Sequence, residues 1–474
     1  MTDTMRRQPA WMIRSIVGLL LMLTFGPGPV LGQVAAEDLL HARAVEAVIW
    51  GVPLVQFKAM RDALAEAGAG FNAVGYHSRI QNWKMQFATP NDTTPYVLAF
   101  WNLAGGPVVF ELPASEEGVA LFGTLMDAWQ RPLEDVGAAG LDGGRGGRYL
   151  LLPPGFRGHV PAGYIPLRQK TLNGYTALRP ILPDTGEESL ARAAEFARRI
   201  RIYPLAEAGD PPPTPSVDLY DNELMGVPTF DGSYFTSLHE ILQEEVVEEK
   251  DLAMLGMLAS IGIEKGAPFA PDGPTGAILE RAAQDALEHL IRLYHTDLIP
   301  PFYDGTRWTI IAPAGVFETG MTYEHPGHLD YQSRGALYYG ICTSVKNPGA
   351  AVFYLSCAKD PEGNWLDGGR TYKLNVPANV PARDFWSVVA YDLQTAAWIR
   401  EKSRVGLDSP TEDLQNNDDG TVDEYMRPRA PDGKESNWVP TAPGDRFFVM
   451  FRFYGPELPV FTKEWSLGDL EMID

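Results

Sequence analysis

Two aspartates lie beside strongly apolar segments, where burial would suit a carboxyl group to acid–base chemistry. Asp92 lies in a polar loop just before the apolar run 96–103, and Asp127 lies inside the apolar run 121–129. Loss of solvation raises the pKa of a carboxyl group toward values useful for proton transfer. If the two side chains share a cleft, they are candidate catalytic residues for paired-carboxylate chemistry.

A structural interpretation of the two aspartates stands beside the catalytic one. Asp92 could cap its own turn, because Asn, Asp and Thr side chains readily bond to nearby backbone groups. Asp127 could pair with an arginine such as Arg131 or Arg148. Under this interpretation both carboxylates stabilise the fold and neither takes part in a reaction.

Candidate substrate-binding residues accompany the two acids. Arg452 lies in the middle of an apolar strand pattern, where alternation could turn it into a pocket; an inward Arg needs an anionic partner, either a structural carboxylate or a substrate anion. Aromatic side chains could hold a ring or a sugar, although core packing explains most of them equally well. The remaining candidates are Asn91, Thr93, Tyr96, Trp101, Trp386, Tyr391, Asn437, Trp438 and Tyr454.

The sequence gives little support for a metal site, a nucleophilic serine or a phosphate-binding loop. His325 and His328 are joined by a short turn, and His289 and His295 are six residues apart, which does not place them on one helix face. No Gly-x-Ser-x-Gly motif occurs. The Gly-rich loop 143–148 leads into a strand and has none of the following helix that a phosphate-binding loop needs. We therefore assign no metal and no cofactor.

Length and charge narrow the class of protein. A chain of 474 residues is long for one domain, so two domains are expected. The formal net charge is −22 and basic residues form no stripe, which argues against a nucleic-acid partner. A small-molecule ligand or substrate fits this composition better than a polyanion does.

The first residues have the pattern of a secretory leader. Arg6, Arg7 and Arg14 precede the apolar run 16–25, which is too short to span a bilayer comfortably, and small residues follow. We expect cleavage after Gly32 or Ala36, a periplasmic or secreted protein, and no stable membrane span afterwards. An uncleaved anchor is the alternative.

The two cysteines leave two possibilities open. If 337–345 and 351–357 form a hairpin, Cys342 and Cys357 lie nearly opposite each other and could form a disulfide in an oxidising compartment. If 329–343 is helical instead, the two thiols could be too far apart to bridge.

The helices and strands expected from the sequence, which must position these residues, indicate an α+β, β-rich fold. Helices are expected at 37–50, 54–67, 190–201, 233–246, 252–261 and 278–294, and 51–53 is expected to separate the first two. Strands 96–103 and 108–112 read as a buried hairpin, and turn signals separate further strands on both sides of the middle third. This pattern predicts two β-sandwich or jelly-roll-like domains with a helical connecting insert. The boundaries are a leader 1–32, an N-terminal module 37–208, a Pro-rich linker and helical insert 209–330, and a C-terminal module 331–474.

The chain resembles the bacterial proteins that pair the domains of unknown function numbered 1254 and 1214. The motifs that carry the resemblance are 91–93 with Tyr96, 101–103, 106–109, Asp127, 147–151, 262–269, 365–368, 385–387 with Tyr391, 417–420, 437–440, and Arg452 with Tyr454. The resemblance implies a two-domain, β-rich architecture with helices and a homo-oligomer, and it brings no agreed reaction. Pro90 departs from the pattern, which commonly has a second Asn before Asn91.

Two hypotheses for the function follow. The first is an exported enzyme that acts on a small organic or sugar-like substrate, with Asp92 and Asp127 as acid and base and Arg452 as the anion contact. The second is a non-catalytic periplasmic protein that binds a ligand or assists envelope assembly through the same residues.

Overall fold

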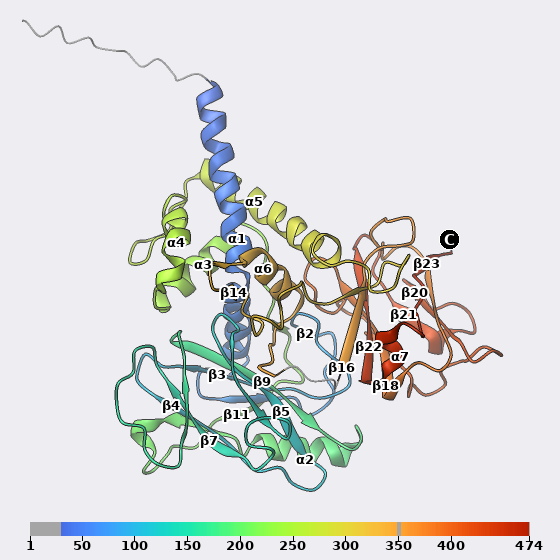
Figure 1. Ribbon diagram of the computed structural model, residues 1–474, viewed down its shortest axis with the longest axis horizontal. Coiled ribbons are helices and arrows are strands. Elements are labelled where there is room, and N and C mark those ends of the chain that lie inside the picture. Colours follow the sequence, from blue (N-terminus) through green and yellow to red (C-terminus); the bar gives the residue numbers. More distant parts are fainter. Residues whose placement is uncertain (1–29, 348–351, 474) are drawn as a thin grey trace, which may run out of the picture. The chain divides into compact units, whose positions relative to one another are not determined.

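The computed structural model describes residues 30–347 and 352–473 (Figure 1). Contacts between backbone positions divide the chain after Leu39, and residues 40–474 form one compact unit. The fold is α+β and rich in β-strands, as the sequence predicts. Most of the leader predicted for 1–32 lies outside the described residues. In the described part of the chain, no helix is both long enough and apolar enough to cross a membrane.

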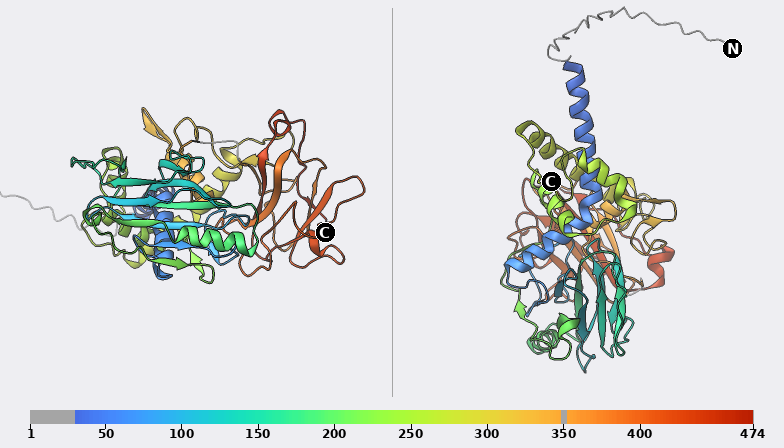
Figure 2. Two further views of the ribbon diagram at one scale, coloured as in Figure 1. Left: turned by 90° about the horizontal axis from the view of Figure 1, so that it is seen from below. Right: turned by 90° about the vertical axis from the view of Figure 1, so that its left-hand side faces the viewer.

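The first module is a sandwich of two sheets, which further views show as stacked layers (Figure 2). Its six-stranded sheet has the order β11 (Ser216–Asp218), β1 (Val74–Tyr76), β3 (Val97–Asn102), β9 (Asn173–Ile181), β5 (Ala120–Asp127) and β6 (Pro132–Gly137). The four-stranded sheet has the order β10 (Arg201–Pro204), β4 (Val108–Leu112), β7 (Gly147–Leu152) and β8 (Ile165–Arg168). Apolar side chains of both sheets fill one core, against which helix α2 (Glu187–Ala197) also packs.

The predicted hairpin of 96–103 and 108–112 is wrong, although both strands exist. β3 pairs with β1 and β9, whereas β4 pairs with β10 and β7 in the other sheet. The turn between them therefore crosses the sandwich. Trp101 of β3 and Phe110 of β4 face each other across it, with ring centroids 6.1 Å apart. Nearly continuous apolar sequence marks a strand covered on both faces but carries no information on which strand it pairs with.

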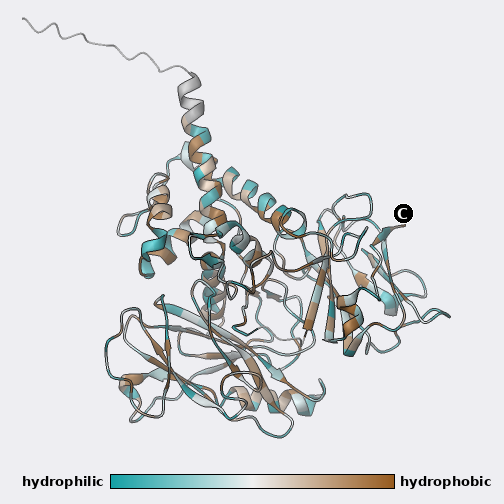
Figure 3. Cartoon of the chain, viewed as in Figure 1, coloured by the Kyte–Doolittle hydropathy of each residue, from teal (hydrophilic) through white to brown (hydrophobic). Residues whose placement is uncertain are grey.

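The second module is also a sandwich. Its five-stranded sheet has the order β13 (Thr309–Ile310), β16 (Val352–Cys357), β22 (Phe447–Pro456), β18 (Ala382–Asp392) and β19 (Gly406–Asp408). The facing sheet consists of β21 (Trp438–Pro440), β20 (Val422–Arg427), β17 (Tyr372–Val376) and β23 (Glu471–Met472). Inward residues of both sheets share a second core, beside which lies the short helix α7 (Leu458–Thr462). Hydrophobic residues recur along the strands of both modules (Figure 3).

Helices form a third core that both modules share. They are α1 (Val30–Glu66), α3 (Ser233–Glu244), α4 (Leu252–Ala259), α5 (Gly273–Arg292) and α6 (Tyr331–Gly340). This core contains Phe100 and Tyr175 from the six-stranded sheet together with Tyr391 and Phe448 from the five-stranded sheet. Two small sheets, β2 (Met85–Gln86) with β12 (Leu224–Met225) and β14 (Glu324–His325) with β15 (His328–Leu329), complete the fold. The helices therefore cover one face of each module as well as connecting them.

Helix α1 continues through Pro53, where the sequence predicts a break. A Pro inside a helix removes one N–H donor and crowds the carbonyl four residues earlier, which is that of Ile49. Side chains supply donors to the neighbouring carbonyls: the Tyr234 hydroxyl donates to Val48 at 2.9 Å and Arg334 Nη2 donates to Trp50 at 3.0 Å. These bonds from α3 and α6 compensate for the interruption, so one helix replaces the two expected.

Cys342 and Cys357 are free thiols in the structure. Cys342 follows helix α6, so the helical alternative for this segment holds and the hairpin does not form. The Cys342 thiol donates to the Ala88 carbonyl at 3.5 Å, and the Cys357 thiol to the Lys359 carbonyl at 3.2 Å. Burial raises the pKa of both thiols, that of Cys342 to about 12.

A candidate functional site between the two modules

A row of polar side chains crosses the five-stranded sheet of the second module. Tyr354 of β16 pairs with Arg452 of β22, Arg452 pairs with Ser387 of β18, and Ser387 pairs with Asp408 of β19. Directly paired residues of antiparallel strands project to the same face of a sheet. The four side chains therefore lie on one face, the face whose apolar positions join the core shared with the first module.

The polar loop ahead of β3 is closed by Asn91. Asn91 Oδ1 accepts hydrogen bonds from the backbone N–H groups of Thr93 and Thr94, both at 2.9 Å, and its Nδ2 donates to the Tyr96 hydroxyl at 2.9 Å. Gln81 Nε2 donates to the carbonyls of Asn91 and Thr94, at 2.7 and 2.8 Å. Asn91, and not Asp92, is thus the residue that ties this turn together.

Side chains of the second module hold this loop. Arg452 Nη2 donates to the carbonyls of Thr89 and Pro90, at 3.2 Å each, and to the Tyr391 hydroxyl. Tyr391 in turn donates to the Pro90 carbonyl at 2.7 Å. The hydroxyl groups of Thr93 and Tyr454 lie 3.2 Å apart. The structure therefore brings together seven of the predicted site residues, namely Asn91, Asp92, Thr93, Tyr96, Tyr391, Arg452 and Tyr454.

The loop is strained at its start. Thr89 has a φ of +41°, a backbone conformation that β-branched residues rarely adopt. Its backbone N–H donates to Ala396 at 2.8 Å and its hydroxyl donates to Gly340 at 2.7 Å, while Arg452 binds its carbonyl. Strained backbone persists where surrounding contacts over-determine it, and such positions cluster at functional sites.

Several buried polar atoms where the loop and the sheet meet have no hydrogen-bond partner within the described part of the protein. They are Asp92 Oδ1, Arg452 Nε and Nη1, and Ser387 Oγ. Arg452 is 2% exposed and Ser387 is 1% exposed. Because unpaired buried polar groups cost free energy, each such group calls for an explanation, and four of them around one loop point to a binding site for a polar ligand.

Asp92 is half-exposed as a residue, but its Oδ1 atom is buried. Burial raises the pKa of Asp92; the charge of Arg452 acts in the opposite direction, and the charge of Asp408 adds to the rise. No ion pair joins Asp92 to Arg452. The pKa of this carboxyl group is therefore higher than that of a solvated aspartate, which is the direction expected from its apolar surroundings.

A second cation lies at the same place. The Arg179 guanidinium of β9 lies 5.4 Å from the centre of the Tyr96 ring and hydrogen-bonds to Tyr354. The Arg452 guanidinium lies 5.2 Å from the Tyr354 ring centre. Burial lowers the pKa of Arg452, but Tyr391, Tyr454, Tyr354 and Asp92 together raise it by more, so this guanidinium keeps its charge.

Asp127 belongs to a different cluster. Its Oδ2 accepts from Arg131 Nε at 2.7 Å, and its Oδ1 accepts from the backbone N–H groups of Trp129 and Arg131 at 3.0 and 3.1 Å. Arg131 also binds Glu248 at 2.8 Å and Glu324 at 3.0 Å. The charges that act on Asp127 are those of Arg131 and Glu248, and neither acts on Asp92. The structure thus gives the two aspartates no common charged neighbour, and Asp127 has the arginine partner that its structural interpretation requires.

The other predicted site residues have structural contacts. Trp101 Nε1 donates to Gln169 at 2.6 Å inside the first sandwich, and Trp386 stacks on Phe451 at 5.5 Å inside the second. Asn437 is buried and its amide bonds backbone groups of Gln415 and Asp423, at 2.8 to 2.9 Å. Trp438 Nε1 donates to the Arg427 carbonyl at 2.8 Å.

Sequence reasoning missed Arg179, Tyr354, Ser387 and Asp408. The position of Arg179, a charged residue directly after the mainly apolar run 175–178, was a signal that could have identified it. Ser387 and Asp408 are ordinary polar residues in sequence, and only the strand register places them beside Arg452. The described residues contain no group of three or more His, Cys, Asp or Glu side chains that could hold a metal ion.

Comparisons with known proteins agree with this architecture. Residues 71–204 match the family described as "Protein of unknown function (DUF1254)" and residues 351–458 match "Protein of unknown function (DUF1214)". The chain is therefore a protein of two β-rich modules. It belongs to the proteins that pair an N-terminal DUF1254 module with a C-terminal DUF1214 module, which confirms the resemblance noted from its motifs.

Solved structures resemble the chain at low identity. The VPA0106 protein from Vibrio parahaemolyticus is 19% identical, with a TM-score of 0.50 over 92% of this chain and 100% of its own. An uncharacterised protein from Burkholderia cenocepacia is 13% identical, with a TM-score of 0.38 over 93% of this chain and 96% of its own. No curated protein matches the chain. At such identity, the likeness to VPA0106 extends to the fold alone.

Proposed function

We propose that the protein binds a small organic anion between its two modules and that Asp92 exchanges a proton with it. Arg452 is the anion contact, and the polar side chains around it orient the ligand. The observation that carries the proposal is the set of unpartnered atoms on Asp92, Arg452 and Ser387 where the loop meets the sheet.

Charge supports an anion over a cation. Arg452 and Arg179 place two guanidinium groups near one loop, and two nitrogen atoms of Arg452 have no acceptor among the described residues. Guanidinium N–H groups form short, charge-assisted hydrogen bonds with carboxylates. A carboxylate ligand would pair with these atoms and would relieve the cost of burying them.

Asp92 supports acid–base chemistry on the bound ligand. Its raised pKa places the carboxyl group nearer to neutral pH than an exposed aspartate, which favours proton transfer. Tyr391 and Tyr454 stay protonated, because burial raises the pKa of both phenols. The Tyr391 proton is already donated to the Pro90 carbonyl, so Tyr454 is the phenol that donates a hydrogen bond to the ligand.

The predicted leader supports export, so the ligand would be one available outside the cytoplasm. Liquid chromatography with mass spectrometry of the protein purified from the periplasm tests this part. A mature chain that begins after Gly32 or Ala36 is the expected result; a full-length chain in the cytoplasm would contradict export.

Binding is tested with acetate, lactate and benzoate against the neutral acetamide, lactamide and benzamide, measured by isothermal titration calorimetry. At least one carboxylate is expected to bind the wild-type protein more tightly than its amide, and R452K is expected to lose that preference. R383Q is a matched control, because Arg383 is an exposed residue of the neighbouring strand β18 that pairs with Asp384. Equal binding of acids and amides would contradict the anion site.

Turnover is tested with the carboxylates that bind, followed by proton NMR. If Asp92 is catalytic, D92N keeps the affinity of the wild-type protein and loses turnover. Tight binding with no conversion by either protein would favour the non-catalytic alternative, in which the same site serves only for recognition.

A further inference from the structure

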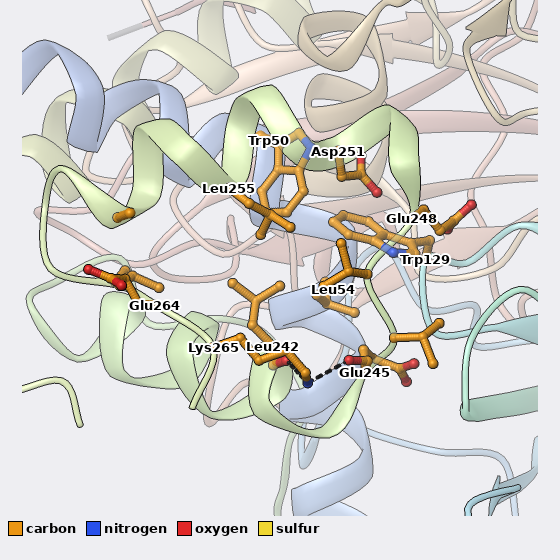
Figure 4. A pocket seen from close by; sticks show the side chains of 14 residues that line it. Trp50, Leu54, Trp129, Leu242, Glu245, Glu248, Asp251, Leu255, Glu264 and Lys265 are labelled. Atoms are coloured by element: carbon orange, nitrogen blue, oxygen red, sulfur yellow. Dashed lines mark hydrogen bonds between the residues drawn. The ribbon is translucent and has the colours of Figure 1, made fainter. Parts of the chain in front are cut away.

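A cavity lies among α1, α3, α4 and the turn after β5. Its volume is about 220 Å³ (Figure 4). Trp50 and Trp129 lie side by side against it, edge to face, with ring centroids 4.8 Å apart. Leu54, Leu242 and Leu255 form its aliphatic wall.

The cavity is held open by bonds that do not depend on a ligand. Lys265 Nζ donates to the carbonyls of Leu242, Gln243 and Glu245 at 2.8, 2.7 and 2.7 Å, which caps the end of α3 and fixes the segment after α4. Lys265, Leu242 and Glu245 are drawn in Figure 4. The Glu245 carboxylate accepts from the backbone N–H groups of residues 172 and 173 at 2.7 and 2.9 Å. Pre-formed pockets of this kind bind ligands without a large ordering cost.

The entrance is unusually apolar for a protein surface. Helix α4 has an apolar sequence, yet Leu258 is its one buried residue. Val246 and Val247, in the segment before α4, are 37% and 47% exposed. Val246 and Val247 line the cavity, so exposed apolar side chains continue into it. Contiguous exposed apolar surface of this kind is typical of a binding site.

The charges at the rim distinguish between ligands. Glu248 pairs with Arg131, and Asp251 pairs with Lys250 at 3.1 Å. Glu264 is exposed, and no ion pair or side-chain hydrogen bond involves its carboxylate within the described residues. The Lys265 ammonium is already held by three carbonyls. An unpaired carboxylate at the mouth attracts a cation and repels an anion.

We propose that this cavity is a second binding site and that it takes a small arylalkyl amine. The ring of the amine packs against Trp50 and Trp129 on one side and against the leucines on the other, and its ammonium group lies at Glu264. The Trp129 ring already has the Arg334 guanidinium at 4.6 Å and the Lys250 ammonium at 5.8 Å from its centre, so the ammonium group of the ligand lies at the mouth. A cavity of roughly 150 Å³ lined by aliphatic and aromatic residues holds a benzene ring. The larger cavity has room for one ring with a short chain.

The test measures binding of phenethylamine, the neutral ethylbenzene and the anionic 3-phenylpropionate to the full-length protein by saturation-transfer NMR and calorimetry. Phenethylamine is expected to bind with a Kd on the order of 0.1–1 mM, as befits so small a ligand. Failure to bind at several millimolar, or tighter binding of the anion, would overturn the proposal.

Two pairs of variants separate binding from folding. L255W fills the cavity and is expected to weaken phenethylamine binding more than about tenfold, whereas L252W, on the same helix but outside the cavity, is expected to leave it unchanged. E264Q is expected to weaken amine binding about two- to fivefold, and E249Q, which removes an exposed carboxylate nearby, is expected to leave it unchanged. Equal effects within either pair would contradict the assignment, and Glu264 is exposed, so its variant is expected to fold.

Discussion

The Tyr391 hydroxyl donates a hydrogen bond of 2.7 Å to the carbonyl of Pro90, which joins the second module to the loop of the first. The contact uses the backbone of residue 90 and not its side chain. Any residue at position 90 offers this carbonyl, so the Pro found there, where the resemblance led us to expect Asn, leaves the bond intact. The loop keeps its place against the sheet because carbonyl groups, which every residue has, receive the bonds from Tyr391 and Arg452.

Replacing Asp92 by Asn is expected to stabilise the folded protein at neutral pH. Its folded-state pKa is raised above the value of 3.8, so ionisation of Asp92 opposes folding, and Asn resembles the protonated form. Wild type and D92N are expected to be equally stable below pH 3.8. As the pH rises from 3.8 to the folded-state pKa, wild type loses stability relative to the variant, and above that pKa the difference stays constant.

Urea denaturation between pH 4 and pH 8, followed by circular dichroism, measures the difference. D408N is a useful comparison, because the Asp408 charge contributes to the raised pKa of Asp92. A D92N protein that is less stable than wild type at pH 7 would show that the carboxylate supports the fold, and the proposed catalytic role would lose its basis.

Replacing Asp127 by Asn is expected to destabilise the protein, although burial raises the pKa of Asp127 as it raises that of Asp92. The Asp127 carboxylate accepts hydrogen bonds from Arg131 Nε and from the backbone N–H groups of Trp129 and Arg131, whereas Asp92 Oδ1 accepts none within the described residues. An Asn side chain would turn its own N–H₂ group toward one of these donors. The expected loss is about 1–3 kcal/mol in the free energy of unfolding, measured by the same urea titration at pH 7. Unchanged stability would mean that Asp127 is not tied to Arg131 in solution.

Glu324 is expected to stabilise the protein at neutral pH and to lose this effect in acid. Burial opposes its ionisation, but Arg131 and Lys250 outweigh that and lower the pKa of Glu324 from 4.5 to about 2. The stabilisation is therefore complete above pH 4.5 and falls as the pH drops toward 2. We expect E324Q to be less stable than wild type by about 1–3 kcal/mol at pH 7, with a shrinking difference at pH 4 and pH 3. A difference that is constant with pH would contradict this ion pair.

Gly335 is expected to tolerate no side chain. It lies in α6 against α1, and a Cβ atom there would be 2.5 Å from the carbonyl oxygen of Ile49, the group whose helical N–H partner Pro53 removes. G335A is expected to lose about 1–3 kcal/mol by overpacking. G276A is the matched control, because that helical glycine has nothing within 4 Å of an added Cβ. It should gain about 0.5–1 kcal/mol. Thermal unfolding of both variants decides between close packing and a loose contact at Ile49.

The sequence predicted much of the fold because strand and helix patterns are local. The predicted strand 108–112 coincides with β4 (Val108–Leu112), and the predicted helix 233–246 with α3 (Ser233–Glu244). The partner of each strand depends on residues far away in sequence, which is why β3 and β4 were wrongly paired. Pro53 shows the same limit, because the donors that let α1 continue come from Tyr234 and Arg334, far along the chain.

The candidate site was predicted in part for a related reason. Arg452 and Asp92 carry signals that sequence can show, a charge within or beside apolar strands. Ser387 and Asp408 became site residues only through the register of β18 with its two neighbours. Arg452 and Asp408 act on Asp92, whereas Arg131 and Glu248 act on Asp127, and the sequence could not assign these neighbours because proximity to an apolar strand does not specify which face of which sheet a residue reaches.

The core that the helices share with the six-stranded and the five-stranded sheet determines which fragments of this protein can be expressed alone. Phe100 and Tyr175 of one module and Tyr391 and Phe448 of the other are buried in the same cluster of side chains. Expression of either family-matched segment alone would leave an apolar sheet face in water, which favours aggregation. The two segments that sequence comparison recognises separately share one hydrophobic core, so we expect a stable recombinant fragment to need both of them and the helices between.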